Sequence, residues 1–310
     1  MSSQTASTTA RLRDGLLGIF DGTDGSTSYW NRLMLGLPLL YVALFLLLGL
    51  GYMFLISFWQ VEQYTLIADW TLGNYVTVLT TYTYLYFIGK SFLTASAVTL
   101  ISLCIGYPIA YYVSKRLQAH QQLGVLLTLS APFFVGTLIR VFAHQGLIGP
   151  TGMINIALIR AGVGHIGLFD YGNFQTLVGE VYLWLPFMIL SIFLSLENID
   201  YELLEAGYDA GASPLRAFYE IVWPLSRPGV VIGSILVFVP TFTDSTVPQF
   251  VGGPSGTQIG MVIHSHFGSS GEWAFGSALS VVLVAISLAV IAALGWTIPW
   301  QAYSVGGEEQ

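Results

Sequence analysis

Six apolar blocks, each long enough to cross a lipid bilayer as a helix, constrain the fold of this chain most strongly. A helix needs about 20 apolar residues to span about 30 Å of hydrocarbon, and backbone groups inside lipid must pair within the segment itself. With only 9% charged residues, the chain lacks the polar surface of a soluble domain, which carries about a quarter charged residues. We therefore predict an all-α integral membrane protein with six transmembrane helices. The blocks cover about residues 33–58, 88–113, 122–143, 175–196, 228–250 and 276–298.

The remaining composition excludes several classes of function. The longest basic run is Lys115-Arg116, so nothing indicates a nucleic-acid partner. The single cysteine, Cys104, excludes an internal disulfide framework, and His264 and His266 lack a third ligand for a metal site. The net charge of −7 is spread over loops and tails, which favours ordinary solvated acids over a surface for a cationic partner.

The distribution of lysine and arginine predicts the orientation of the chain, because cytoplasmic loops are enriched in these residues. If both termini are cytoplasmic, seven of the ten basic residues lie on the inner side. We therefore expect a cytoplasmic N-terminal tail at 1–32, a transmembrane domain at 33–298 and a cytoplasmic C-terminal tail at 299–310. The inner residues are Arg11, Arg13, Arg32, Lys115, Arg116, Arg216 and Arg227.

Two loops between the blocks are long. On this topology residues 144–174 face outside and contain the stretch 153–161, which predicts a short interfacial helix. Residues 198–227 face inside. In the block that follows them, Gly229 and Gly233 form a pair of small residues at the spacing that permits close helix approach.

The inner loop begins with a strong helix signal. Asp200 is a good N-cap, and Glu202 falls in the positively polarised first turn. The stretch 201–210 suits a helix, and Gly211 is a natural stop. We therefore expect a short helix that ends at this glycine.

A second short helix is predicted directly after the glycine. Ser213 supplies the N-cap and Pro214 the first helical position, and the helix should run to about Val222 before Pro224 ends it. Two short helices joined by a sharp turn make a rigid hairpin at the membrane surface.

Such a hairpin has two interpretations. It can receive force from a partner outside the membrane, to which Leu215, Phe218 and Tyr219 would offer apolar surface. It can equally be a structured loop that packs only against its own bundle. Residue chemistry alone favours neither.

The spacing of residues in this loop resembles the EAA motif of permeases in binding-protein-dependent ABC importers. That motif reads E-A-A, three residues, G, nine residues, I, one residue, L-P. Gly207 replaces the second alanine here, and Trp223 replaces the leucine. The matching residues are Glu205, Ala206, Gly211, Ile221 and Pro224.

The resemblance implies a fold like that of type I ABC importer permeases, with the hairpin as the coupling helix that docks into an ATPase subunit. It also implies a location in a bacterial or archaeal inner membrane, a second homologous permease, two ATP-binding subunits and a periplasmic substrate-binding protein, besides the surrounding membrane lipid. The chain itself then has no catalytic residues and no cofactor, since the partner ATPases bind ATP and magnesium. The coupling residues would be Glu205, Ala206, Gly207, Gly211, Ala212, Ser213, Pro214, Phe218, Ile221 and Pro224.

From about residue 88 to 290 the chain is similar to the spermidine/putrescine subfamily of these permeases. This similarity implies inward transport of a small cationic amine such as a polyamine. The chain departs from the subfamily at Thr243-Asp244-Ser245 and at Glu180, which leaves opines, amino-acid derivatives and betaines as alternative solutes. The similar stretches are GYPIAYYVSKRL at 106–117, LIRVFAHQGLIGPTGMIN at 138–155, LPFMIL at 185–190, VFVPTFTDSTVPQFVGGP at 237–254 and EWAFGSALS at 272–280.

Two carboxylates fall inside the predicted spans, Glu180 early in the fourth and Asp244 late in the fifth. A carboxylate in hydrocarbon costs several kcal/mol, so each should face the bundle interior, water or a cation. They can form an acidic lining for an ammonium-bearing substrate, or they can lie at the interface or pair with Arg140 or Lys90. Aromatic neighbours for cation–π contacts would be Tyr182, Trp184 and Phe242.

Other functions are less well supported by the sequence. Gly89-Lys90-Ser91 lacks the earlier glycine of a phosphate-binding loop, since Tyr84 stands there. The stretch 268–271 matches the serine motif of rhomboid-type proteases, but no histidine follows His266 to act as a base. A stand-alone secondary carrier remains an alternative, although the inverted repeats common in carriers are not evident here.

Overall fold

A computed structural model describes residues 25–62 and 65–297 of the chain. The predicted C-terminal tail at 299–310 and most of the predicted N-terminal tail lie outside the described residues. The chain divides into two units, Met1–Leu55 and Ile56–Gln310.

The first unit contains helix α2 (Gly25–Ile56). The helix begins at Gly25, inside the stretch expected to be tail, and its membrane-spanning part is Gly36–Ile56. This part agrees with the first predicted span.

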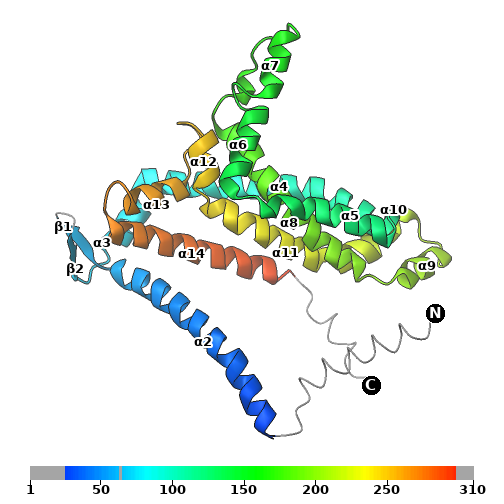
Figure 1. The fold of residues 1–310 in the computed structure, drawn as a ribbon, viewed down its shortest axis with the longest axis horizontal. Coiled ribbons are helices and arrows are strands. Elements are labelled where there is room, and N and C mark those ends of the chain that lie inside the picture. Colours follow the sequence, from blue (N-terminus) through cyan, green and yellow to red (C-terminus); the bar gives the residue numbers. More distant parts are fainter. Residues whose placement is uncertain (1–24, 63–64, 298–310) are drawn as a thin grey trace. The chain divides into compact units, whose positions relative to one another are not determined.

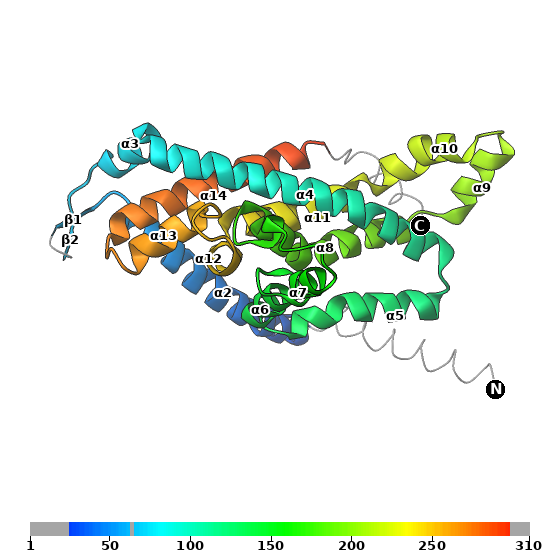
Figure 2. The same cartoon turned by 90° about the horizontal axis from the view of Figure 1, so that it is seen from above.

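The second unit is built around long helices. Helices α4, α8 and α11 pack against one another, and α14 packs beside α11 (Figure 1; Figure 2). The bounds of its longer elements are α4 (Tyr82–Arg116), α5 (Ala119–Ser130), α6 (Thr137–Ile148), α8 (Asn173–Glu197), α11 (Trp223–Thr243) and α14 (Trp273–Gly295). The shorter helices are α3 (Gly73–Thr80), α7 (Met153–Arg160), α9 (Tyr201–Asp209), α10 (Pro214–Ala217), α12 (Thr246–Val251) and α13 (Ile259–Phe267), with helical turns η1 (Ala131–Phe134), η2 (Gly167–Phe169) and η3 (Phe218–Val222).

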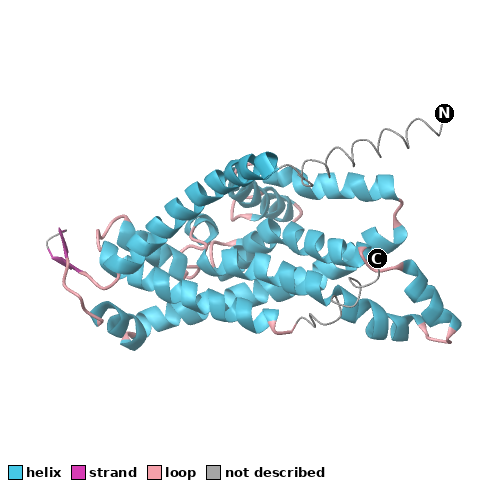
Figure 3. Cartoon of the chain, turned by 90° about the horizontal axis from the view of Figure 1, so that it is seen from below, coloured by secondary structure: helices cyan, strands magenta, loops and turns pink. Residues whose placement is uncertain are grey.

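Five helices of the described residues are long and apolar enough to cross a membrane, and a sixth span arises if a bent pair of helices counts as one. The prediction of an all-α membrane bundle is therefore confirmed, apart from one short hairpin that the sequence analysis missed. Strands β1 (Gln60–Glu62) and β2 (Thr65–Ile67) pair antiparallel, with Val61 opposite Leu66 (Figure 3).

The third predicted span is not a continuous helix. The segments 119–134 and 137–160 meet at an angle of 103°, and α6 and α7 leave the bundle (Figure 1). Pro132 lies in a tight 3-10 turn, and the backbone is extended at Val135 and Gly136, so the hydrogen-bond ladder is interrupted there. The expectation of one helix over 122–143 is wrong for this reason. The short helix predicted at 153–161 is confirmed as α7.

Small residues bring α11 against α8 as their spacing predicted. A Cβ atom on Gly229 would lie 2.6 Å from the carbonyl oxygen of Ser191, and one on Gly233 would lie 2.8 Å from Sδ of Met188. Glycine at 229 is therefore needed for the observed approach of the two helix backbones, while Gly233 lies against the flexible side chain of Met188. A Cβ atom on Gly106 of α4 would lie farther away, 3.2 Å from Cγ of Met188 and 3.4 Å from Cγ1 of Ile189 on α8.

Candidate functional site

The inner-loop hairpin begins as the sequence predicts and lies at one end of the bundle (Figure 2). Asp200 caps α9, and its Oδ1 accepts a hydrogen bond from the backbone N–H of Glu202 at 3.1 Å. Helix α9 ends at Asp209, and Gly211 adopts a φ of 86°, a left-handed conformation that favours glycine. The first helix and its glycine stop are confirmed.

The second arm starts as predicted but does not end at Pro224. Ser213 Oγ accepts a hydrogen bond from the N–H of Arg216 at 3.3 Å, and Pro214 takes the first helical position. The helix then passes through η3, a π-helical turn, and continues as α11. The N–H of Trp223 donates to the carbonyl of Phe218 in this wider turn. Pro224 has no backbone N–H, and the wider turn lets the helix continue without that hydrogen bond. Pro214–Thr243 therefore forms one 30-residue helix.

Aromatic contacts fix this second arm to α4. Phe218 packs edge-on against Tyr107 and Tyr111, with ring centroids 5.7 and 6.1 Å apart. Tyr107 also lies 5.6 Å from the ring of Trp223, and its hydroxyl bonds to Ser226 Oγ at 2.8 Å in a buried position. The hairpin is therefore attached to the bundle by packing as well as by chain continuity.

The outward surface of the hairpin differs from the prediction at one position. Leu215 is 72% exposed and Tyr219 is 66% exposed, as expected for a surface that a partner contacts. Phe218 instead faces α4, because Tyr107 and Tyr111 form its packing surface. Phe218 is therefore half-buried, and only part of its ring is available as the apolar surface that the sequence predicted.

Gly207 and Ile221, two positions of the EAA-like spacing, touch each other. A Cβ atom on Gly207 would lie 2.8 Å from Cδ1 of Ile221. The carbonyl of Gly207 also accepts from the N–H of Ala212 at 3.0 Å, which closes the turn. Glycine at 207 thus lets the two arms of the hairpin pack closely.

The two intramembrane carboxylates form a second candidate site. Glu180 is fully buried on α8. Its Oε2 accepts from Nε1 of Trp184 at 2.9 Å, while its Oε1 has no hydrogen-bond partner among the described residues. Thr241, near the end of α11, and Asp244, directly after it, have side chains close to the carboxyl group of Glu180. The hydroxyl of Thr241 is also buried without a partner in the described part of the chain.

The carboxylate of Asp244 accepts hydrogen bonds from the backbone of the segment that follows it. Asp244 follows the last residue of α11, and its two carboxylate oxygens accept from the N–H groups of Thr246 at 3.0 Å and Val247 at 2.9 Å. Asp244 therefore orders the start of α12, where a negative charge is favourable. The predicted span to residue 250 is broken at this aspartate.

The basic residues considered as partners for these carboxylates bind elsewhere. Lys90 Nζ donates to the carbonyls of Ser255 and Thr257, the latter at 2.9 Å. Arg140 Nη2 donates to Thr137 Oγ1 at 3.2 Å. Within the described residues, neither carboxylate forms an ion pair with lysine or arginine. The pairing alternative is therefore not observed.

Of the three predicted aromatic neighbours, Trp184 is the one with a hydrogen bond to a carboxylate among the described residues. Trp184 bonds to Glu180. Phe242 is fully buried in a separate apolar cluster with Phe238, and Tyr182 stacks on the ring of His144 at 6.2 Å. Sequence reasoning missed Thr241, although a hydroxyl within a span directly after Pro240 is a usable signal.

Comparison with known proteins decides the family. Residues 102–298 match the family described as the binding-protein-dependent transport system inner membrane component. The chain belongs to this family. The matched range includes both the hairpin and the two carboxylates, so the permease carries both candidate sites within its family-defining region.

Individual relatives agree with this assignment. The permease is 34% identical over 223 residues, 71% of its length and 77% of the relative's, to the spermidine/putrescine transport system permease protein PotB of Haemophilus influenzae. It is 34% identical over 219 residues, 70% of its length and 78% of the relative's, to PotB of Escherichia coli. It is 29% identical over 291 residues, 86% of its length and 92% of the relative's, to the inner membrane ABC transporter permease protein YdcU of Escherichia coli.

Solved structures share the fold of the permease. A bacterial ABC transporter involved in the import of the acidic polysaccharide alginate superposes with a TM-score of 0.62 at 14% identity, covering 86% of this chain and 96% of that one. The same kind of transporter in complex with an alginate-bound periplasmic protein gives a TM-score of 0.64 at 13% identity, covering 86% and 92%. The type I importer fold expected from the sequence is thereby confirmed.

Proposed function

We propose that this inner-membrane permease moves a small cationic amine, such as a polyamine, into the cell, driven by ATP-binding subunits that contact the α9–α10 hairpin. The substrate class is supported by the names of the PotB relatives and by the two carboxylates in the spans. The single observation that carries the coupling role is the continuity of the hairpin's second arm with α11.

The proposed assembly follows from the family. A second homologous permease pairs with this chain, two ATPases bind beneath it, and a periplasmic binding protein delivers substrate from outside. Both termini and the hairpin are cytoplasmic in this arrangement, as the basic residues indicate. ATP and magnesium are held by the ATPases, so this chain carries no covalent chemistry.

In the proposed cycle, ATP binding closes the two ATPases and moves the hairpins that contact them. Because α10, η3 and α11 form one helix, that movement shifts the span directly, and hydrolysis resets it. Leu215 and Tyr219 are the exposed apolar side chains for the ATPase groove. Glu205 lies exposed on α9 and contributes a charge to the same interface.

We further propose that Glu180 and Asp244 form a subsite for one ammonium group of the substrate. A buried carboxylate with an unbonded oxygen and no lysine or arginine beside it is costly. An ammonium group supplies both the missing charge and hydrogen-bond donors for Glu180 Oε1 and Thr241 Oγ1. Trp184 holds Glu180 in place through its indole N–H.

Reconstitution in proteoliposomes tests the function. The permease, its partner permease, the ATPases and the binding protein together should take up labelled spermidine only when ATP is present on the ATPase side. Uptake by this chain alone, driven by an ion gradient, would show that it is a secondary carrier and would refute the proposal. Thermal stabilisation of the binding protein by amines, opines, amino-acid derivatives and betaines identifies the solute class.

A further inference from the structure

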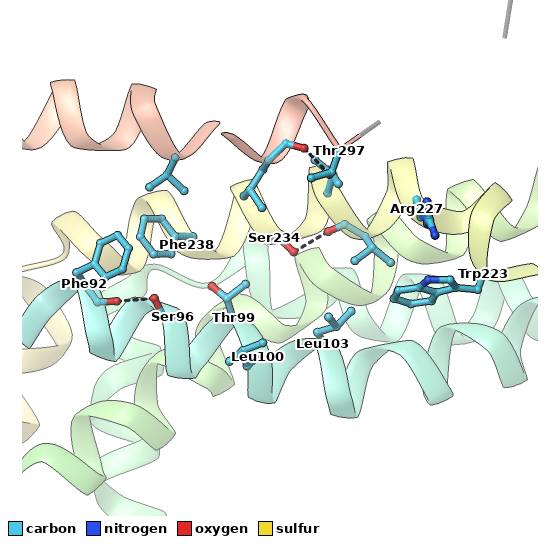
Figure 4. A pocket seen from close by; sticks show the side chains of 14 residues that line it. Phe92, Ser96, Thr99, Leu100, Leu103, Trp223, Arg227, Ser234, Phe238 and Thr297 are labelled. Carbon is cyan, nitrogen blue, oxygen red and sulfur yellow. Dashed lines mark hydrogen bonds between the residues drawn. The ribbon is translucent and has the colours of Figure 1, made fainter. Parts of the chain in front are cut away.

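A groove between α4, α11 and α14 shares Trp223 with the attachment of the hairpin, but its wall includes neither the exposed hairpin surface nor the two carboxylates. Its volume is about 630 Å³, and Figure 4 shows the side chains that line it. Its wall is formed by Phe92, Ser96, Thr99, Leu100, Leu103, Trp223, Arg227, Val230, Val231, Ser234, Phe238, Val290, Leu294 and Thr297.

The wall of this groove is apolar along most of its length. Its hydroxyl groups on α4 and α11 already bond to backbone carbonyls of their own helices: Ser96 to Phe92 at 2.8 Å and Ser234 to Val230 at 2.7 Å. Thr99 is likewise bonded to a carbonyl within α4. These hydroxyls therefore offer little to a polar ligand, and the wall suits a hydrocarbon chain.

One end of the groove has a different chemistry. Arg227 is the charged residue of the wall and is exposed, and Trp223 lies one helical turn before it on the same helix. Among the described residues, Arg227 has no ion pair and no hydrogen bond from its side chain. Figure 4 shows Arg227 and Trp223 together at one end, with Phe92 and Phe238 at the other.

The length of the groove matches one leaflet of a bilayer. The 11-residue separation of Arg227 and Phe238 along α11 corresponds to about 16 Å of helix rise. Half of the hydrocarbon core is about 15 Å thick. Arg227 therefore lies at headgroup depth when Phe238 lies near the midplane, and tryptophan is typical of that interfacial level.

We propose that this groove binds one anionic phospholipid, with its phosphate at Arg227 and an acyl chain along the apolar wall towards Phe238. An unpaired cation at one end of an apolar groove is complementary to a lipid that is anionic at one end and apolar along the rest. Basic pockets between spans at the membrane surface bind anionic headgroups in this way. The assignment to the cytoplasmic leaflet rests on the proposed function, because the coupling hairpin adjoins Arg227; the binding itself does not.

Lipid titration of the purified transporter complex tests the proposal. Native mass spectrometry would follow binding of dioleoyl-phosphatidylglycerol and of dioleoyl-phosphatidylcholine, which share acyl chains and differ in net charge. Arg227→Gln should lower the affinity for phosphatidylglycerol about fivefold, the effect of one basic side chain near an anionic headgroup, and should weaken phosphatidylcholine binding less, because the choline cation offsets the charge of its phosphate. Arg227→Lys should retain most of the preference, because lysine also supplies a cation.

Two further variants complete the test. Arg160→Gln removes an exposed arginine from α7 and should change neither affinity. Val230→Trp fills the groove and should weaken the binding of both lipids. Equal phosphatidylglycerol affinity in the wild type and Arg227→Gln overturns the proposal. Loss of the partner permease from Val230→Trp without a change in lipid binding overturns it too, because the groove would then be a protein interface. No substrate or ATP is needed, so a failure of amine uptake leaves the result interpretable.

Discussion

At the scale of single residues, Glu180 and Asp244 differ in how their carboxylates are bonded. The carboxylate of Glu180 is fully buried, one oxygen is bonded to Trp184 and the other has no partner in the described part of the chain. A purely structural carboxylate would have both oxygens bonded, as Asp244 does at the start of α12. This difference supports the proposed role of Glu180 in binding the substrate, whereas Asp244 also orders the start of α12.

Replacing Glu180 by glutamine tests the ammonium subsite. Glutamine keeps the volume and can still accept from Trp184, but it removes the charge that attracts a cation. We expect the KM for amine uptake to rise about tenfold, equivalent to about 1.4 kcal/mol, with assembly of the complex unchanged. Glu197→Gln changes an exposed carboxylate near the other end of α8 and serves as the control. Wild-type KM in Glu180→Gln would remove this residue from the substrate path.

Gly207 allows a graded test of the hairpin. Alanine at 207 contacts only the flexible end of Ile221, so Gly207→Ala should retain uptake. Gly207→Val places branched carbons against Ile221, and overpacking of this kind costs about 1–3 kcal/mol. We expect Gly207→Val to lose most substrate-stimulated ATPase activity of the complex while still inserting into the membrane. Equal ATPase activity in the two variants would contradict the packing argument.

At the scale of elements, the sequence predicted helices well where local chemistry decides them. Helix α9, its cap at Asp200 and its stop at Gly211 follow from residue types alone. The continuation through Pro224 could not be predicted, because a proline ends a regular α-helix and the π-helical turn that accommodates it depends on packing against Tyr107. The break at Val135–Gly136 was overlooked because both flanking segments are apolar, although Pro132 and Gly136 signal it in the sequence.

The contact between α8 and α11 gives a prediction at this scale. Gly229→Leu would place its side chain within reach of the α8 backbone at Ser191, so the helices must separate. We expect a clear fall in the midpoint of thermal unfolding in detergent and a loss of assembled complex. Gly124→Leu is the matched control, because a Cβ there meets nothing within 4 Å. Similar midpoints for the two variants would show that the close approach contributes little.

At the scale of the whole molecule, the orientation of the chain can be measured directly. Cys104 is the single cysteine, so Cys104→Ser provides a thiol-free background. In this background Ala210→Cys, on the hairpin, should react with a membrane-impermeant thiol reagent only from the cytoplasmic side. Val163→Cys, after α7, should react only from outside. Both positions are exposed, and the reverse labelling pattern would exclude contact between the hairpin and cytoplasmic ATPases.

The uninterrupted helix from Pro214 to Thr243 has a mechanical consequence. Its 30 residues include a π-helical turn and internal prolines at 228 and 240, and they extend for about 45 Å, so the hairpin and Asp244 stand at opposite ends of one helical segment. The close packing of Gly229 and Gly233 against α8 lies part-way along this helix, so the helix would tilt about that contact. In the proposed coupling cycle, a small tilt at the ATPase end therefore becomes an opposite displacement of the helix end beside Glu180.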